Sequence, residues 1–170
     1  TTPDLVSGIA AGRFHIAIHS LASDPPSDDL LSVHLWTEHF VAVVPPGHPL
    51  LPVDDQVREP LDPHGLTEHP LIAIARPGAA VDPDTGGALS AWGLEIPLAW
   101  QSEQPQSVVN LARAGLGVGV LNALAARISD TTGMVVAPVG SLAEGRQVAA
   151  TRGLSAAPSP GGAPVFSGGR

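Results

Sequence analysis

The chain contains no cysteine and no lysine among its 170 residues, and its sixteen acidic residues outnumber its eight arginines. The lack of cysteine excludes a disulfide framework and a thiolate metal site, and it suits a reducing compartment. The formal net charge of −8 gives a surface that repels phosphates. We therefore expect this segment alone not to bind nucleic acid, because it offers no basic helix for a DNA groove.

Long hydrophobic runs are missing as well. No basic segment followed by an apolar stretch opens the chain, and no apolar run approaches the roughly 18 residues that cross a bilayer. We expect a soluble, cytoplasmic protein without a membrane partner. The hydrophobic fraction of 44% is sufficient for a core in one domain or two small lobes.

Motifs for metal binding and catalysis are also absent. A zinc helix needs two histidines at i and i+4 with a third ligand, whereas His15 and His19 lie on a candidate strand and no H-E-x-x-H occurs. The G-x-S-x-G turn of serine hydrolases is missing too. The sequence predicts no catalytic residue, no metal site, no cofactor and no enzymatic activity.

The clearest pattern lies at residues 102–122, which read as loop, helix, glycine stop and strand. An i, i+3, i+4, i+7 spacing predicts one helical face from Val108, Leu111, Ala112 and Gly115. Pro105 fits the first turn, and Gly115 fits the left-handed position that ends a helix. The following strand carries Gly117 and Gly119, as expected where another backbone approaches closely.

These alternating glycines also invite a dinucleotide-binding interpretation. The phosphate fingerprint places its glycines after a strand and at the start of a helix. Here they end a helix and open a strand, and position 120 is valine. Capping and close packing are therefore the favoured explanation.

Four segments in order resemble the effector-binding domain of LysR-type transcriptional regulators, over roughly residues 1–155. They are GRFHIAI at 12–18, VVPPGHPL at 43–50, PLI at 70–72 and LARAGLGVGVLN at 111–122. The resemblance implies an α/β, two-lobed fold like that of type 2 periplasmic binding proteins. The chain departs from the family at His15, where Asp is usual, and at Asn122, where Pro is usual.

The resemblance also implies a domain organisation. Residues 1–50 are expected to form part of lobe I, 51–143 lobe II and 144–155 a return to lobe I, while 156–170 form a Pro/Gly-rich tail predicted to be disordered. The chain is expected to be a fragment that lacks the opening strand of this domain and the helix-turn-helix. In the intact protein we expect a homo-oligomer that contacts DNA only through that missing N-terminal domain.

Local patterns predict the remaining elements. Helices are expected at 3–12, 82–92 and 123–130, and strands at 14–19, 30–36, 39–44, 71–75, 96–100, 134–139 and 147–152. Phe14, Ile16 and Ile18 are expected to face one helix layer, with Ala17 facing another. In the last helix, Leu124 and Ile128 are expected to point inward.

The candidate effector site consists of His19, Ser20, Gln101 and Ser102. His19 ends the first strand and Ser20 opens the loop after it, where ligands of open α/β sheets bind. Gln101 and Ser102 lie in a predicted loop at 101–104 before the central helix, whose first turn favours an acidic ligand. By resemblance, a small organic acid or aromatic metabolite binds there in an interlobe cleft. Alternatively, Ser20 turns the chain, His19 is solvated and Ser102 caps the helix. A solute-binding or catalytic protein on the same fold is the competing function.

Overall fold

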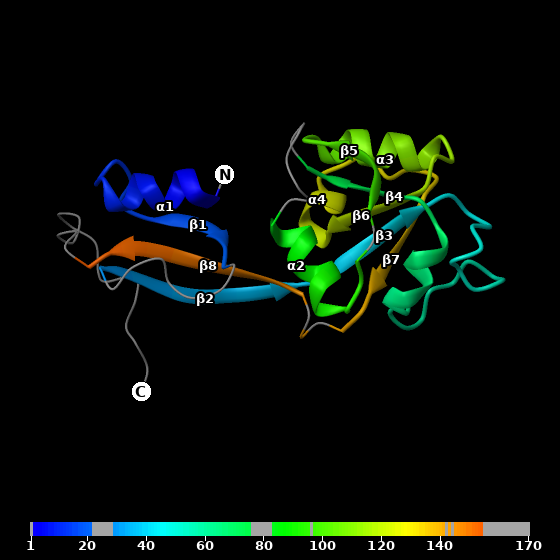
Figure 1. Ribbon diagram of the computed structural model, residues 1–170, viewed down its shortest axis with the longest axis horizontal. Coiled ribbons are helices and arrows are strands. Elements are labelled where there is room, and N and C mark those ends of the chain that lie inside the picture. Colours follow the sequence, from blue (N-terminus) through cyan, green and yellow to red (C-terminus); the bar gives the residue numbers. More distant parts are fainter. Residues whose placement is uncertain are drawn as a thin grey trace. The chain divides into compact units, whose positions relative to one another are not determined.

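A computed structural model describes residues 2–21, 29–75, 83–95, 97–141, 143 and 145–154 (Figure 1). Contacts divide the chain into a smaller unit, Thr1–Leu35 with Val148–Arg170, and a larger unit, Trp36–Gln147. The first residue of the helix expected at 82–92 and the tail at 156–170 lie outside the described residues.

The smaller unit combines one helix with a three-stranded sheet. Helix α1 (Thr2–Ala10) precedes β1 (Ala17–Ser20), and the sheet order is β1-β8-β2, with β2 at Leu30–Glu38 and β8 at Arg146–Gly153. Strand β1 runs antiparallel to β8. Gly12 follows α1 with a φ of +67°, a conformation that glycine adopts without strain. Ile9, Ala17 and Leu30 are buried together between helix and sheet.

The predicted orientation of the first strand was wrong. Phe14, Ile16 and Ile18 are 43%, 46% and 57% exposed, whereas Ala17 and His19 are buried. Side chains alternate between the faces of a strand, so the face that carries Ala17 turns toward α1 and the isoleucines take the other. Phe14 precedes the strand and packs beside α1, where a Cβ on Gly8 would overlap its ring.

The larger unit contains a five-stranded mixed sheet in the order β5-β4-β6-β3-β7. The central strand is β6, and β3 lies between β6 and β7 and pairs antiparallel with both, while β4 pairs parallel with β5 and β6. The strands span Phe40–Val44 (β3), Leu71–Ile74 (β4), Leu98–Ser102 (β5), Val118–Asn122 (β6) and Val135–Val139 (β7).

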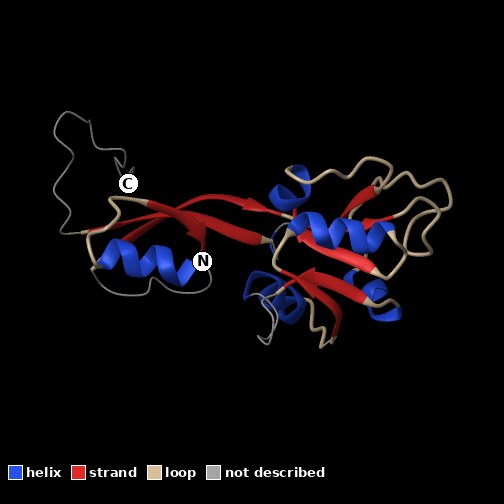
Figure 2. Cartoon of the chain, turned by 90° about the horizontal axis from the view of Figure 1, so that it is seen from above, coloured by secondary structure: helices blue, strands red, loops and turns tan. Residues whose placement is uncertain are grey.

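Helices cover both faces of this sheet (Figure 2). One face packs with Leu89 and Trp92 at the end of α2 (Pro83–Ala91). The other face packs against α3 (Pro105–Arg113) and the short α4 (Ala123–Arg127). All five residues of β3 are buried, as expected for a strand with a partner on each edge and a layer on each face.

The helix and strand predicted at 102–122 are confirmed as α3 and β6. Pro105 is in the first turn, and Gly115 has a φ of +75° just after the helix. The buried residues of α3 are Val108, Val109 and Ala112, and the predicted Leu111 is partly buried and packs against the same core, so Val109 is an addition to the predicted face. A Cβ on Gly119 would lie 3.2 Å from a Val108 methyl, which confirms the close approach of helix and strand.

Two short helical elements complete the larger unit. The connector at 51–69 contains a 3-10 turn, η1 (Pro63–Glu68), and Asp62 caps it by accepting from the His64 N–H. Helix α4 is shorter than predicted, and Leu124 and Ile128 are 44% and 75% exposed rather than inward. Because α4 ends at Arg127, Ala125 and Ala126 make its contact with the core.

The two compact units of the structure and the two expected lobes differ in where they place residues 36–50. These residues were expected in lobe I, but β3 forms ladders with β6 and β7 and groups with the larger unit. Within the described ranges, no helix is long and apolar enough to span a bilayer.

Candidate functional site

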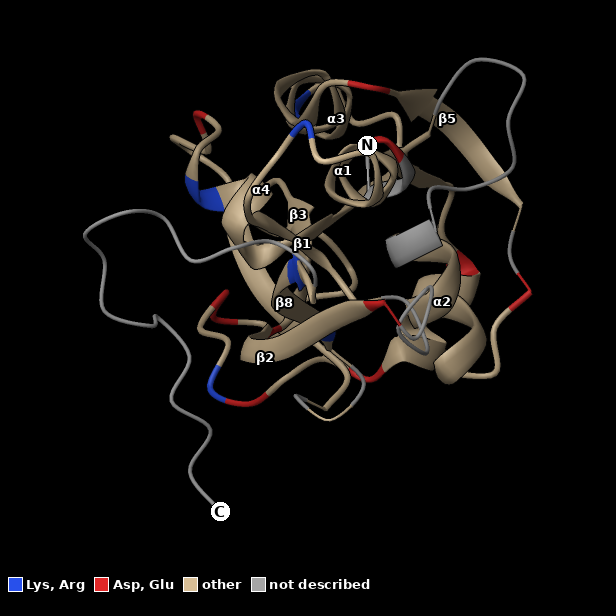
Figure 3. Ribbon diagram, turned by 90° about the vertical axis from the view of Figure 1, so that its left-hand side faces the viewer, with Lys and Arg blue, Asp and Glu red and all other residues tan. Residues whose placement is uncertain are grey.

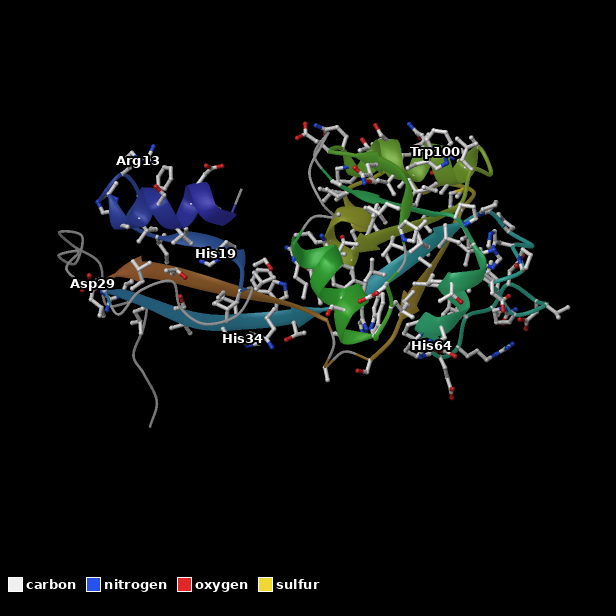
Figure 4. The ribbon with its side chains drawn as sticks, in the orientation of Figure 1. Arg13, His19, Asp29, His34, His64 and Trp100 are labelled. Atoms are coloured by element: carbon white, nitrogen blue, oxygen red, sulfur yellow. The ribbon has the colours of Figure 1, made fainter. Side chains whose placement is uncertain are left out.

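In the smaller unit, His19, which is labelled in Figure 4, belongs to a chain of hydrogen bonds that joins all three strands. Its Nδ1 is 2.7 Å from the Ser20 carbonyl oxygen, and its Nε2 is 2.8 Å from the Thr151 hydroxyl. The Thr151 hydroxyl is in turn 2.7 Å from the hydroxyl of Ser32. His19 is 6% exposed and Thr151 is fully buried, so the hydrogen bond between them is shielded from water, while Ser32 is half-buried.

If the His19 ring is neutral, its two hydrogen-bond partners determine which ring nitrogen donates and which accepts. A carbonyl oxygen only accepts, so Nδ1 of His19 carries the proton and donates to Ser20. Nε2 is then an acceptor, and it receives the Thr151 proton. Thr151 accepts from Ser32 in turn. Both ring nitrogens of His19 are therefore occupied within the protein, and the ring holds the backbone at Ser20.

Gln101 and Ser102 belong to the larger unit, where they are the last two residues of β5. The strand extends two residues beyond its predicted end, so the predicted loop is reduced to Glu103 and Gln104. The cause is the ladder with β4, which continues to the pair Ile74 and Ser102. The Ser102 carbonyl oxygen also accepts from the Ala75 N–H at 3.1 Å.

Ser102 is not the cap of α3. The N-cap residue is Gln104, whose side chain makes no capping hydrogen bond, and the Ser102 hydroxyl oxygen accepts from the Gln104 N–H at 3.1 Å. This contact uses a lone pair of Ser102 and leaves its proton available to donate. The first turn of α3 carries partial positive charge, so the end of β5 presents a hydroxyl donor next to a helix terminus that favours anions.

Polar contacts fix the position of α3. Gln106, in its first turn, accepts from the Asp130 N–H at 2.7 Å, and Arg113, in its last turn, donates to the Asp130 carbonyl oxygen at 2.8 Å. Hydrogen bonding from Thr132 lowers the pKa of the Asp130 carboxyl below its ordinary value, with a smaller contribution from Arg113. Helix α3 is therefore held at both ends.

A second cluster in the larger unit pairs His48 with His69, whose ring centroids are 4.7 Å apart. His48 Nδ1 accepts from the Leu50 N–H at 3.2 Å. Partial burial lowers the pKa of His48 below its ordinary value, and repulsion by a protonated His69 lowers it further. Because the folded pKa of His48 lies below the unfolded one, the contribution of His48 to stability is present above the unfolded pKa and is lost as pH falls through the folded pKa.

We expect His69→Gln to raise the pKa of His48, because the variant removes the neighbouring positive charge. The measurement is an NMR titration of the His48 ring. His64→Gln is the control, since His64 is exposed on the same 3-10 turn and should leave the titration unchanged. An unchanged His48 pKa in His69→Gln would show that burial alone causes the shift.

The described residues contain no group of three or more His, Cys, Asp or Glu side chains placed to hold a metal ion. Acidic residues outnumber basic ones in the chain, sixteen to eight, and in the ribbon they lie mostly in loops and at element ends (Figure 3). Such an excess of negative charge repels a phosphate backbone.

The structure brings together residues that the sequence did not connect. Thr151 and Ser32 complete the environment of His19, and Glu38 forms a buried ion pair with Arg146. Partners in these contacts lie 132, 119 and 108 residues apart in the chain. No local spacing or motif carries such information, so sequence reasoning missed them.

Comparison with known structures identifies the fold class. Full-length BenM E226K mutant gives a TM-score of 0.77 at 14% identity, over 93% of this chain and 50% of that one. Full-length CbnR complexed with its target DNA gives a TM-score of 0.70 at 16% identity, over 93% of this chain and 51% of that one. The BenM effector-binding domain with its effector benzoate gives a TM-score of 0.73 at 15% identity, over 89% of this chain and 66% of that one. The chain has the α/β, type 2 periplasmic-binding-protein-like fold of these domains.

The family follows from the sequence model for the LysR substrate binding domain, which matches residues 1–160. The chain belongs to this family, as the four ordered segments predicted. Comparison with curated protein sequences gives no significant match. The chain spans about half the length of the full-length regulators that it resembles.

Proposed function

We propose that this chain is the effector-sensing part of a cytoplasmic, homo-oligomeric LysR-type transcriptional regulator, without catalytic activity of its own. The observation that carries the proposal is the family match over residues 1–160. Similar structures include a regulator bound to its target DNA and a domain bound to benzoate, which supports DNA and a small-molecule effector as partners of the whole protein. DNA binding would reside outside this acidic segment.

We propose a small organic acid or aromatic carboxylate as the effector. Ser102 and Gln101 would bind its carboxylate beside the first turn of α3, where the Ser102 hydroxyl has a proton to donate and the helix terminus favours an anion. Ser20 would contribute from the end of β1, with His19 holding its backbone in place. Binding would shift the regulator between two conformations for which the effector has different affinities.

The test is titration calorimetry of the intact regulator against a panel of small carboxylates. Ser102→Ala and Ser20→Ala should each weaken binding by about 1.5–3 kcal/mol, the usual cost of losing a hydrogen bond to a charged group. Ser90→Ala is the matched control, because Ser90 is an exposed residue of α2. Unchanged affinity in both site variants, with the fold intact, would place the effector elsewhere.

A further inference from the structure

A buried ion pair lies beside both points where the chain passes between its two units. The passages come at Leu35–Trp36 and at Gln147–Val148. Glu38 is the last residue of β2, and Arg146 is the first residue of β8. The Arg146 Nε donates to the Glu38 Oε1 at 2.9 Å, and the two side chains are 19% and 9% exposed.

The second oxygen of the same carboxylate reaches a helix. Glu38 Oε2 accepts from the Leu124 N–H at 2.9 Å, in the first turn of α4. The neighbouring Ala123 N–H donates to the His39 carbonyl oxygen at 2.9 Å, and Asn122 caps α4 through the Ala125 N–H. One carboxylate therefore joins the end of β2, the beginning of β8 and the start of α4.

Stability alone is a weak reason for such a pair. Removing two charges from water is costly, and an apolar pair of similar volume often stabilises a fold equally well or better. Unlike an apolar contact, the ion pair is directional, because each of its hydrogen bonds requires a particular placement of both partners. Asp54 and Arg58 form a contrasting pair within one loop, with side chains 46% and 68% exposed, and such pairs contribute little.

We propose that Glu38 and Arg146 form a pivot that fixes both crossing segments to the α4 end of the larger unit. Motion of the smaller unit is then confined to the few residues around 35–37 and 147–148. In the proposed function, the pivot converts effector binding into a defined change of conformation rather than a diffuse one. Only this last step rests on the proposed function, because the pivot itself needs no effector.

The absence of native cysteine allows a direct test with spin labels. Labels at Asp29→Cys and Glu59→Cys, both exposed, report the distribution of distances between the two units in the ligand-free 170-residue chain. Glu38→Met/Arg146→Met removes both charges together, so it should remain folded. We expect this double variant to broaden the distance distribution clearly without lowering the melting temperature by more than a few degrees.

Two further variants complete the experiment. Arg146→Lys keeps the charge but lacks the guanidinium Nε–H, so it should broaden the distribution to a smaller extent even if the methionine variant does not fold. Asp54→Asn/Arg58→Met is the control and should leave the width unchanged. An unchanged width in the folded Glu38 and Arg146 variants, or equal broadening in the control, would overturn the pivot. Effector titration tests the proposed function separately.

Discussion

Gly117→Ala is expected to destabilise the larger unit by about 3–5 kcal/mol, through backbone strain combined with overpacking. Gly117 has a φ of +152°, and a Cβ at this position would overlap the carbonyl oxygen of Pro70. That oxygen accepts the Val118 N–H at 2.8 Å just where β6 begins beside β4. The backbone therefore cannot move away from the methyl group without losing the start of the parallel ladder.

Chemical denaturation followed by circular dichroism measures this effect. Gly87→Ala is the matched control, because Gly87 is an exposed residue of α2 with open space around its Cα. Alanine is the better helix former, so this control should stabilise the protein by up to about 1 kcal/mol. A Gly117→Ala variant as stable as the wild type would contradict the close approach of β6 to Pro70.

Thr151→Val should destabilise the smaller unit by about 2–4 kcal/mol, because two polar groups lose a partner while the side-chain volume is kept. The variant leaves His19 Nε2 and the Ser32 hydroxyl without the group that joins them. Thr151 is fully buried, so water does not readily replace it. The loss should appear as faster hydrogen exchange of the β1 and β8 amides.

Thr151→Ser separates the hydroxyl from the methyl group. The serine variant keeps both hydrogen bonds, so it should retain most of the protection and keep the ¹⁵N pattern of a His19 ring protonated at Nδ1. Equal exchange rates in the valine and serine variants would show that the buried hydroxyl contributes nothing beyond packing.

The helix and strand at residues 102–122 could be predicted because their determinants are local. Pro105 marks the first turn, Gly115 takes the left-handed conformation after the last one, and Gly119 permits close packing against Val108. The cap of α4 is equally local, because the Asn122 side chain accepts from the Ala125 N–H three residues later. In each case, the residue type and its immediate neighbours determine the conformation.

Predictions failed where a distant partner decided the outcome. An alternating strand has two faces, and only the position of α1 selects Ala17 over Ile16 and Ile18 for burial. The strand β5 reaches Ser102 because its ladder with β4 extends that far, which no residue near Ser102 reveals. For the candidate site, the sequence identified polar residues at strand ends. It could not identify Thr151 as the partner of His19, because the two residues lie 132 positions apart in the chain.

The position of β3 between β6 and β7 has a consequence for biosynthesis. This strand is a run of five apolar residues, FVAVV, and both of its neighbours, β6 and β7, are translated much later, at Val118–Asn122 and Val135–Val139. While the nascent chain is shorter than that, the segment leaves the ribosome with neither edge paired. Such a segment is prone to associate with other chains until its partners arrive. Chaperone binding to nascent chains should therefore be strongest between the emergence of β3 and that of β6.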